Sequence, residues 1–273
     1  MLLYQDYTCL TTDEVLENAQ REIQAHSVGF VYDDNPLGSG TLVQWDNDFG
    51  ILTAGHVANE FDFGSRTLLR IPVLGCGHTL AIPCCLLTEV AKFYQYEGPD
   101  IALIKLPTSP FLSHLKAKKL FLNLTVRTER KLRESIGTTG LFLLSGGPAA
   151  LSQNRAPDHG FSRLVDSPSM RFQGLFRKRF TKDGFDYVEV EAQCKKTVGV
   201  DSLGGVSGGG LWRVMVAQSK VAERHHYHGV ALAGVAFFQR PMKLDGTRIL
   251  LCHGGESIFT RLLAVVALQP TTN

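Results

Sequence analysis

Short apolar segments separated by turn-forming residues recur along almost all of this 273-residue chain. Gly, Pro, Asn and Asp, which favour tight turns, lie between them. The main segments are 28–32, 40–45, 50–54, 67–74, 101–106, 120–126, 140–144, 187–192, 210–216 and 229–238. Strands of this length at this spacing predict an all-β fold, either an antiparallel barrel or a sandwich. No long helical periodicity separates the segments, so a doubly wound α/β sheet is not expected.

Helices are expected only near the two ends of the chain. Thr11 and Glu14 form the pattern of a capping box, in which each side chain bonds the backbone N–H of the other residue. The apolar residues that follow share one helical face: Val15, Leu16, Ala19 and Ile23. At the other end, 257–268 predicts a strand that leads into a short terminal helix.

The least regular part of the chain is 145–185, which we predict to form long loops. Its second half, 171–182, is both basic and aromatic. Such a segment can contact nucleic acid or an acidic protein. A solvated loop or hairpin is the simpler interpretation, so nucleic acid is not expected as a partner.

Composition argues against several other classes of protein. The formal net charge of +2 is too small to indicate a nucleic-acid surface, and no apolar run has the length of a membrane span. The first residues include acids and lack the apolar stretch of a secretory signal. The chain has only six cysteines and two of them are adjacent, so we expect no disulfide framework and instead reduced thiols in a cytoplasm. No C-x-x-C pair is present, so we do not expect a metal site.

Ser207 stands in the glycine-rich run GVSGG at 205–209, which fits two unrelated catalytic patterns. One is the G-x-S-x-G nucleophile elbow of α/β-hydrolases, whose acid and histidine follow the serine along the chain. Here only Asp245 and His253 are placed to serve, and they lie too near the end of the chain to build that fold. The helix expected after an elbow is also missing.

The second pattern requires a histidine, then an aspartate, then the serine. His56 follows a strand-like run in ILTAGHV, and Asp100 precedes another in GPDIALIKL. Each residue alone is more simply a packing or turn residue. All three together, in this order, favour a catalytic triad of His56, Asp100 and Ser207.

The segments TAGH, DIAL and SGG resemble the three signature segments of the trypsin/chymotrypsin serine protease family, in the order of that family. GSGTLV before the histidine and GVAFF after the serine are similar to family segments as well. The resemblance covers roughly residues 28–265. It implies a double antiparallel six-stranded β-barrel with the site between the barrels. The implied domains are an N-terminal helical extension at 1–27, a first barrel at 28–130, and a second barrel with a C-terminal helix at 131–273.

The resemblance also implies a chemical role for each residue of the site. His56 would accept the proton of Ser207, and Asp100 would hold the imidazole in the correct tautomer. The backbone N–H groups of Gly205 and Ser207 would bind the oxyanion that forms on the attacked carbonyl. This chemistry requires no metal and no other cofactor.

Asp201 lies six residues before Ser207, where the family has the floor of the pocket for the residue preceding the cut bond. With Ser202 beside it, this carboxylate resembles the trypsin version and predicts cleavage after Arg or Lys. The pocket wall and the strand that pairs with substrate would come from Ala236, Phe237 and Phe238. Trypsin has glycine at the position of Phe238, so the phenylalanine is expected to narrow the entrance. Ser257 lies near the position of another pocket glycine.

Val206 marks a departure from the secreted trypsins. Those enzymes carry an acid directly before the serine, and this acid binds a newly cut N-terminus. Val206 cannot form that ion pair, so packing or a partner must order the oxyanion loop. We therefore expect an intracellular, bacterial, non-zymogen member of the family, located in the cytoplasm. A regulatory protein is expected to dock on the N-terminal helix or on 145–185.

The expected function is that of a serine endopeptidase that cleaves protein substrates and does not associate with membranes. Two alternatives remain open from the sequence. One is a trypsin-like shell that binds a partner without cutting it, and the other is a serine esterase.

Overall fold

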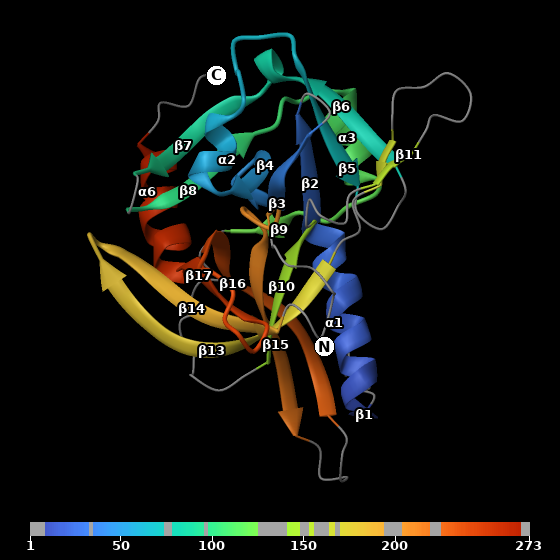
Figure 1. Ribbon diagram of the computed structural model, residues 1–273. Coiled ribbons are helices and arrows are strands. Elements are labelled where there is room, and N and C mark those ends of the chain that lie inside the picture. Colours follow the sequence, from blue (N-terminus) through green and yellow to red (C-terminus); the bar gives the residue numbers. More distant parts are fainter. Residues whose placement is uncertain are drawn as a thin grey trace.

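Two β-sheets, one above the other in the view of Figure 1, make up most of the protein. The computed structural model describes residues 9–32, 35–73, 78–95, 98–124, 141–147, 153–155, 164–166, 170–193, 204–218 and 225–268. None of the helices in these ranges combines the length and the apolar composition needed to cross a membrane.

The first sheet contains eight strands in the order β6-β5-β2-β3-β4-β8-β7, with β9 beside β3. All pairings are antiparallel except that of β9 with β3. The strands are β2 (Ser27–Tyr32), β3 (Asn35–Trp45), β4 (Asp48–Thr53), β5 (Leu68–Val73), β6 (His78–Pro83), β7 (Thr88–Tyr94), β8 (Asp100–Lys105) and β9 (Leu122–Asn123). Three short helices belong to this half: α2 (Gly55–Asn59), η1 (Cys84–Leu86) and α3 (Pro110–Lys116).

The second sheet closes into a six-stranded antiparallel barrel. Its order is β16-β15-β10-β13-β14-β17, and a further pairing of β17 with β16 completes the ring. The strands are β10 (Leu141–Gly146), β13 (Met170–Lys182), β14 (Phe185–Gln193), β15 (Gly210–Gln218), β16 (His225–Gln239) and β17 (Thr247–Gly254). The short β1 (Cys9–Leu10) adds to β16, and β11 (Gln153–Arg155) pairs separately with β12 (Leu164–Asp166). The all-β prediction with two antiparallel barrels is confirmed.

A hydrophobic core shared by the two barrels explains why β8 is apolar on both faces. Successive side chains of a strand point to opposite faces. Ala102 and Ile104 therefore lie in the interior of the first barrel, whereas Ile101 and Leu103 lie in a second cluster. That second cluster also contains Trp212 of β15, whose side chain is fully buried. A third cluster fills the interior of the second barrel.

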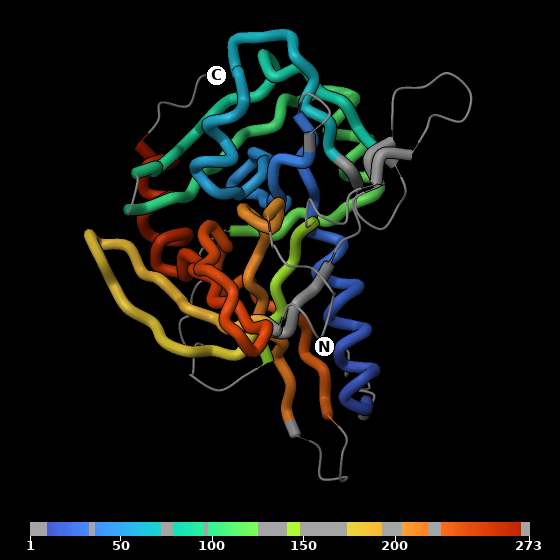
Figure 2. The backbone as a smooth tube through the Cα atoms, viewed as in Figure 1, coloured from blue at the N-terminus to red at the C-terminus, as the bar shows by residue number. Residues whose placement is uncertain are grey.

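Helix α1 (Thr12–His26) lies along the second barrel, as Figure 2 shows. The predicted capping box is confirmed, because Thr11 Oγ1 accepts from Glu14 N and Glu14 Oε2 accepts from Thr11 N at 2.7 Å. The helix buries Val15, Ala19 and Ile23 in the shared core, with Leu16 packed beside them. A hydrogen bond of 2.6 Å from Tyr227 Oη to Glu22 fixes it to β16.

Residues 257–267 are helical, so the predicted strand at the start of 257–268 is wrong. A π-helical segment, η3 (Ser257–Leu262), leads into α6 (Leu263–Ala267). The reason is that Ile258, Phe259 and Leu262 all bury in one direction, which helical spacing allows and a strand does not. The predicted terminal helix itself is present.

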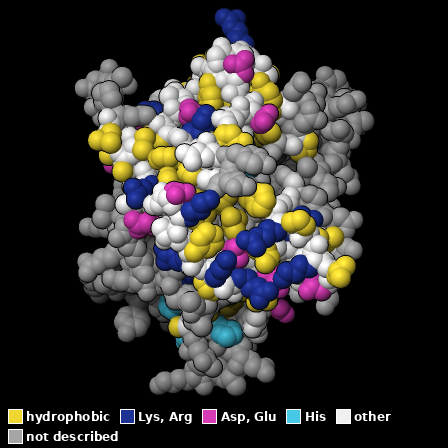
Figure 3. Space-filling model, turned by 60° about the vertical axis from the view of Figure 1, so that its left-hand side comes forward, with side chains coloured by type: hydrophobic (Ala, Val, Ile, Leu, Met, Phe, Trp, Pro, Cys, Tyr) yellow, Lys and Arg dark blue, Asp and Glu magenta, His cyan; other side chains and the backbone are white. Residues whose placement is uncertain are grey.

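The prediction of long loops over 145–185 is wrong for the described residues, which include β11, β12 and all of β13, whereas the alternative of a hairpin at 171–182 is confirmed. Strand β13 pairs with β14 in a hairpin that turns at Asp183 and Gly184. Both turn residues have positive φ, of 53° and 77°, as tight hairpin turns require. The basic run is neutralised by acidic residues of β14, through the pairs Arg177–Glu191, Lys178–Glu189 and Arg179–Asp186. Figure 3, seen with the hairpin side forward, shows basic side chains with acidic ones among them.

The predicted domain boundaries at 27, 130 and 131 stay predictions. The first sheet begins at Ser27 and its last strand ends at Asn123, and the second barrel begins at Leu141. The boundary between the barrels falls in 125–140, outside the described residues. Of the predicted extension at 1–27, the described residues 9–26 pack on the second barrel through α1 and β1.

Replacement of Ile23 by alanine tests the docking of α1. Ile23 is fully buried in the shared core, so Ile23→Ala should lower the free energy of unfolding by about 2–5 kcal/mol. Glu17→Ala on the exposed face of the helix should change it by less than about 0.5 kcal/mol. Chemical denaturation measures both values. Equal effects of the two substitutions would contradict this docking.

Candidate active site

His56 and Asp100 are brought together by neighbouring strands of the first barrel. His56 lies on α2, directly after β4, and Asp100 is the first residue of β8. Strands β4 and β8 are antiparallel neighbours with Thr53 opposite Ala102, so the end of one meets the start of the other. His56 Nδ1 lies 2.7 Å from Asp100 Oδ2, and His56 N donates to Oδ1 at 2.8 Å.

This geometry sets the tautomer of the histidine. The carboxylate only accepts hydrogen bonds, so His56 Nδ1 carries the proton and Nε2 remains available as a base. Asp100 is largely buried, whereas the His56 side chain is 36% exposed. Gly55 is required here, since an added Cβ would lie 2.6 Å from Phe93 O and 3.0 Å from Asp100 Oδ1.

Ser207 lies in a tight glycine-rich turn before β15. Gly205 and Gly208 have φ values of 90° and 85°, which glycine adopts without strain. Gly208 N donates to Ala236 O at 2.7 Å, and Gly209 N donates to Val206 O at 2.8 Å. The Val206 side chain is buried in the interior of the second barrel. A buried valine side chain thus stands at the sequence position where a secreted trypsin has its acid.

Ser39 of β3 holds this turn from the opposite barrel. Its N–H donates to Ser207 O at 2.8 Å, and its hydroxyl donates to Gly205 O at 2.6 Å. The hydroxyl also accepts from Gly147 N at 3.0 Å. Sequence reasoning marked the segment GSGTLV but missed this role of Ser39. The signal available was a polar residue between two glycines at the start of an apolar strand.

The backbone of Ser207 is therefore anchored beside the segment that carries His56. Gly208 approaches Thr53 and Ala54 so closely that an added Cβ would overlap Thr53 Oγ1. Thr53 Oγ1 in turn donates to Ser39 O at 2.8 Å. Among the described residues, no hydrogen bond joins the Ser207 hydroxyl to the His56 ring. Direct contact between these two side chains stays a prediction.

The predicted pocket is only partly within the described residues. Asp201 and Ser202 lie outside them. Ala236 and Phe237 are buried, whereas Phe238 is 54% exposed. The ladder between β15 and β16 ends at Val235, so 237–239 lie beyond it.

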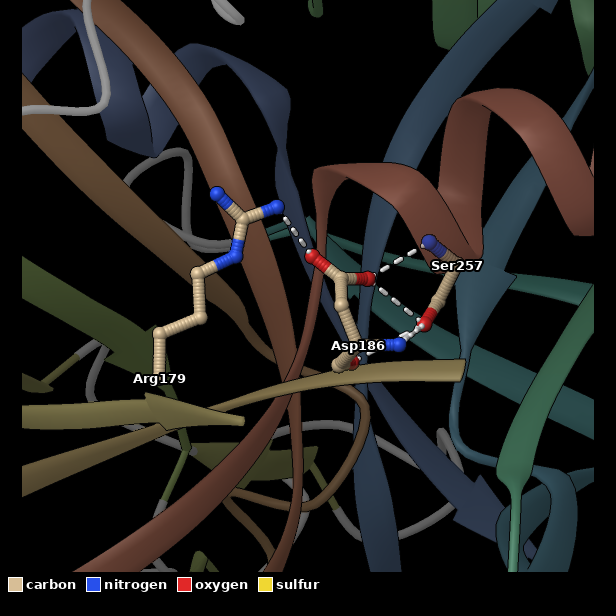
Figure 4. Close-up of polar contacts among 3 residues, drawn as sticks. All are labelled: Arg179, Asp186 and Ser257. Carbon is tan, nitrogen blue, oxygen red and sulfur yellow. Dashed lines mark hydrogen bonds and ion pairs between the residues drawn. The ribbon is translucent and has the colours of Figure 1, made fainter. Parts of the chain in front are cut away.

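Ser257 is bonded to Asp186, as Figure 4 shows. Asp186 Oδ1 accepts from Ser257 N at 2.7 Å and from Ser257 Oγ at 2.8 Å. Asp186 Oδ2 accepts from Arg179 at 2.7 Å. This contact joins the β13–β14 hairpin to the start of η3, and it accounts for the serine without reference to the pocket.

His253 of β17 contacts the aspartate of the site, which sequence reasoning missed. Its Nε2 accepts a hydrogen bond of 2.9 Å from Asp100 N, and the ring is fully buried. Burial lowers the pKa of His253 to about 4, although the nearby Asp100 and Asp186 carboxylates act in the opposite direction. Asp245, which an α/β-hydrolase would pair with this histidine, instead accepts from Thr247 N and Oγ1 in a turn.

In the described part of the chain, no group of three or more His, Cys, Asp and Glu side chains is arranged to hold a metal ion. His225 begins a run of histidines and a tyrosine, HHYH at 225–228, and its Nε2 lies 3.4 Å from Thr12 Oγ1.

Comparison with known proteins identifies the fold. No protein-family model matches the chain, and no curated protein matches it. The serine endoprotease from Yersinia pestis is similar in structure, with a TM-score of 0.51 at 15% identity over 92% of this chain and 66% of that one. A form of the HtrA-type protease AlgW with a tripeptide has a TM-score of 0.51 at 13% identity over 92% of this chain and 64% of that one. This chain thus spans slightly less than two thirds of each structure. Its fold is that of the trypsin-like serine proteases.

Removal of the Ser39 hydroxyl tests its role in holding the turn. Ser39→Ala leaves the half-buried Gly205 carbonyl and the buried Gly147 N–H without this partner, which should lower the free energy of unfolding by about 1–3 kcal/mol. Ser113→Ala, at an exposed position of α3, should have an effect below about 0.5 kcal/mol. Denaturation curves measure both. An unchanged stability of Ser39→Ala would show that the hydroxyl contributes nothing to the turn.

Proposed function

We propose that this chain is a serine endopeptidase with His56, Asp100 and Ser207 as its catalytic triad. The observation that carries the proposal is the His56–Asp100 pair, 2.7 Å apart, beside a turn that presents Ser207. The two structures compared above are proteases by name, and they share this fold at low sequence identity.

The proposed reaction uses His56 Nε2 as the base. Nε2 accepts the Ser207 hydroxyl proton while Oγ forms a bond to the substrate carbonyl carbon. The imidazolium then donates this proton to the leaving amine as the carbon–nitrogen bond breaks, which leaves an acyl-enzyme. A water molecule then attacks the acyl carbon, with His56 again accepting and returning the proton, and the carboxylic acid is released. Asp100 remains ionised throughout and stabilises the charged imidazole.

The oxyanion of each tetrahedral intermediate would bind to the N–H groups of Gly205 and Ser207. Such donors are effective only when they are fixed before the reaction. Ser39 donates hydrogen bonds to the carbonyls of Gly205 and Ser207. These bonds support that role, because they restrict rotation of the adjoining peptide planes.

Protein substrates would add to β16 as an extended strand. Residues 237–239 lie beyond the ladder with β15, and Phe238 is exposed there. Backbone pairing at a strand edge gives affinity, and side-chain pockets give specificity. Asp201 would form the floor of the first pocket, with Ser202 beside it, and select Arg or Lys. We also propose that a regulatory protein controls the enzyme and that the enzyme is located in the cytoplasm.

Labelling with a fluorophosphonate tests the nucleophile. The probe should label the native protein and fail on Ser207→Ala, while Ser113→Ala labels normally. Asp100→Asn should label about 10⁴-fold more slowly, because the histidine loses the partner that sets its tautomer. In-gel fluorescence measures all four rates.

The alternatives give different outcomes in the same assay. Labelling with turnover of small esters but no cleavage of peptides would identify a serine esterase. Absence of labelling, together with salt-sensitive binding to a polyanion, would identify a binding protein.

A peptide-library digest tests the pocket. The wild type should cut after Arg or Lys, and Asp201→Ala should lose at least about 30-fold in kcat/KM on these substrates. Ser202→Ala serves as the neighbouring control and should keep the preference. If Asp201→Ala retains the wild-type preference, Asp201 is not the specificity residue.

A further inference from the structure

His253 is a fully buried polar side chain of the second barrel that reaches the first barrel. Its Nε2 lies 2.9 Å from the backbone N of Asp100, at the start of β8. The ring lies among aromatic side chains, with Phe237 stacked at 4.6 Å, Tyr187 at 4.9 Å and Phe185 at 5.9 Å between ring centroids. An apolar ring would suit these surroundings equally well, so the polarity of the residue requires an explanation.

Its hydrogen bonding determines the protonation of the ring. A backbone N–H always donates, so His253 Nε2 must be without a proton, and the neutral ring carries its proton on Nδ1. Nδ1 is buried and has no hydrogen-bond partner in the described part of the chain. A buried donor without a partner is destabilising. The unpaired Nδ1–H therefore destabilises the fold, while Nε2 forms the hydrogen bond to the backbone of Asp100.

We infer that His253 is a positioning residue for Asp100, which holds the aspartate backbone so that both carboxylate oxygens face His56. This inference rests on the proposed protease function. Asp100 is fixed from two sides, by His253 at its backbone and by His56 at its carboxylate. Because His253 belongs to β17 and Asp100 to β8, the bond also ties the triad to the packing of one barrel against the other.

The contact depends on a neutral ring, since an imidazolium has no acceptor. The titratable groups that face His253 are Asp100 at the start of β8 and Asp186 and Tyr187 of β14. Both carboxylates favour the protonated ring, but burial outweighs them and keeps the pKa near 4. The stability from this site is thus complete above the unfolded value of about 6.5 and is lost as pH falls from there toward 4.

Two substitutions distinguish the contribution of the hydrogen-bond acceptor from that of the ring itself. His253→Gln supplies a side-chain carbonyl that can accept from Asp100 N at every pH, whereas His253→Leu keeps the apolar volume and removes the acceptor. We expect His253→Gln to keep kcat within about threefold of wild type. His253→Leu should lower kcat by about 10- to 100-fold at little-changed KM, because a small displacement of Asp100 affects the reaction and not the pocket. His114→Gln, on exposed α3, is the matched control.

Nitrogen-15 NMR of the histidine rings tests the inference without turnover. The signals that disappear in His253→Gln should show a neutral ring with an unprotonated Nε2 and a protonated Nδ1 between pH 7 and 5. The hydrogen-bonded Nδ1–H signal of His56 should persist in His253→Gln and shift or broaden in His253→Leu. The melting temperature of wild type should fall more steeply below pH 6.5 than that of His253→Gln.

The outcomes distinguish this inference from the proposed function. A protonated Nε2, an unchanged His56 signal in His253→Leu, or equal kcat for the wild type and His253→Leu would overturn the positioning role. If His253→Leu does not fold, identical acid slopes for wild type and His253→Gln would overturn it instead. Failure of the wild type to react with a fluorophosphonate would reject the protease function, while the NMR signals still decide the bond between His253 and Asp100.

Discussion

Packing of the two barrels around one shared hydrophobic core is the constraint on which the site depends. Ile101 and Leu103 of the first barrel lie in this core with Trp212 of the second. Dense packing leaves each barrel little freedom to shift against the other. Polar groups on either side can therefore meet at hydrogen-bonding distance, as Ser39 meets the Ser207 turn and Asp100 meets His253.

The turn that carries Ser207 is held by neutral groups. Val206 is buried in the second barrel, and Ser39 accepts one N–H while its own two donors bind the carbonyls of Gly205 and Ser207. None of these contacts involves a charge or a chain terminus. Val206 indicated a departure from the secreted trypsins, and that the turn needs no cleavage of the chain stays a prediction.

The sequence predicted features that depend on local pattern. The short apolar runs indicated the all-β fold, Thr11 and Glu14 indicated the start of α1, and the motif order paired His56 with Asp100. Local sequence pattern does not reveal contacts between segments that lie far apart in the chain. Ser39 and His253 act on residues more than a hundred positions away, across the interface of the barrels. Local pattern favoured a solvated loop or hairpin for 171–182, and the structure has the β13–β14 hairpin there, whose basic strand is neutralised by acids that come later in the chain. Asp201, Ser202 and the side-chain contact of Ser207 with His56 stay predictions.

Closure of the second sheet has a consequence for solubility and for capture of other chains. A ring of paired strands shortens the rows of free backbone groups through which sheets of different molecules fuse into aggregates. In the described residues such a row remains at 175–182 of β13, which pair only with β14. The β15 ladder stops at Val235, three residues before β16 passes Phe238. In the proposed function, an extended polypeptide would pair with this short stretch of β16, which lies on a different strand from the free edge of β13.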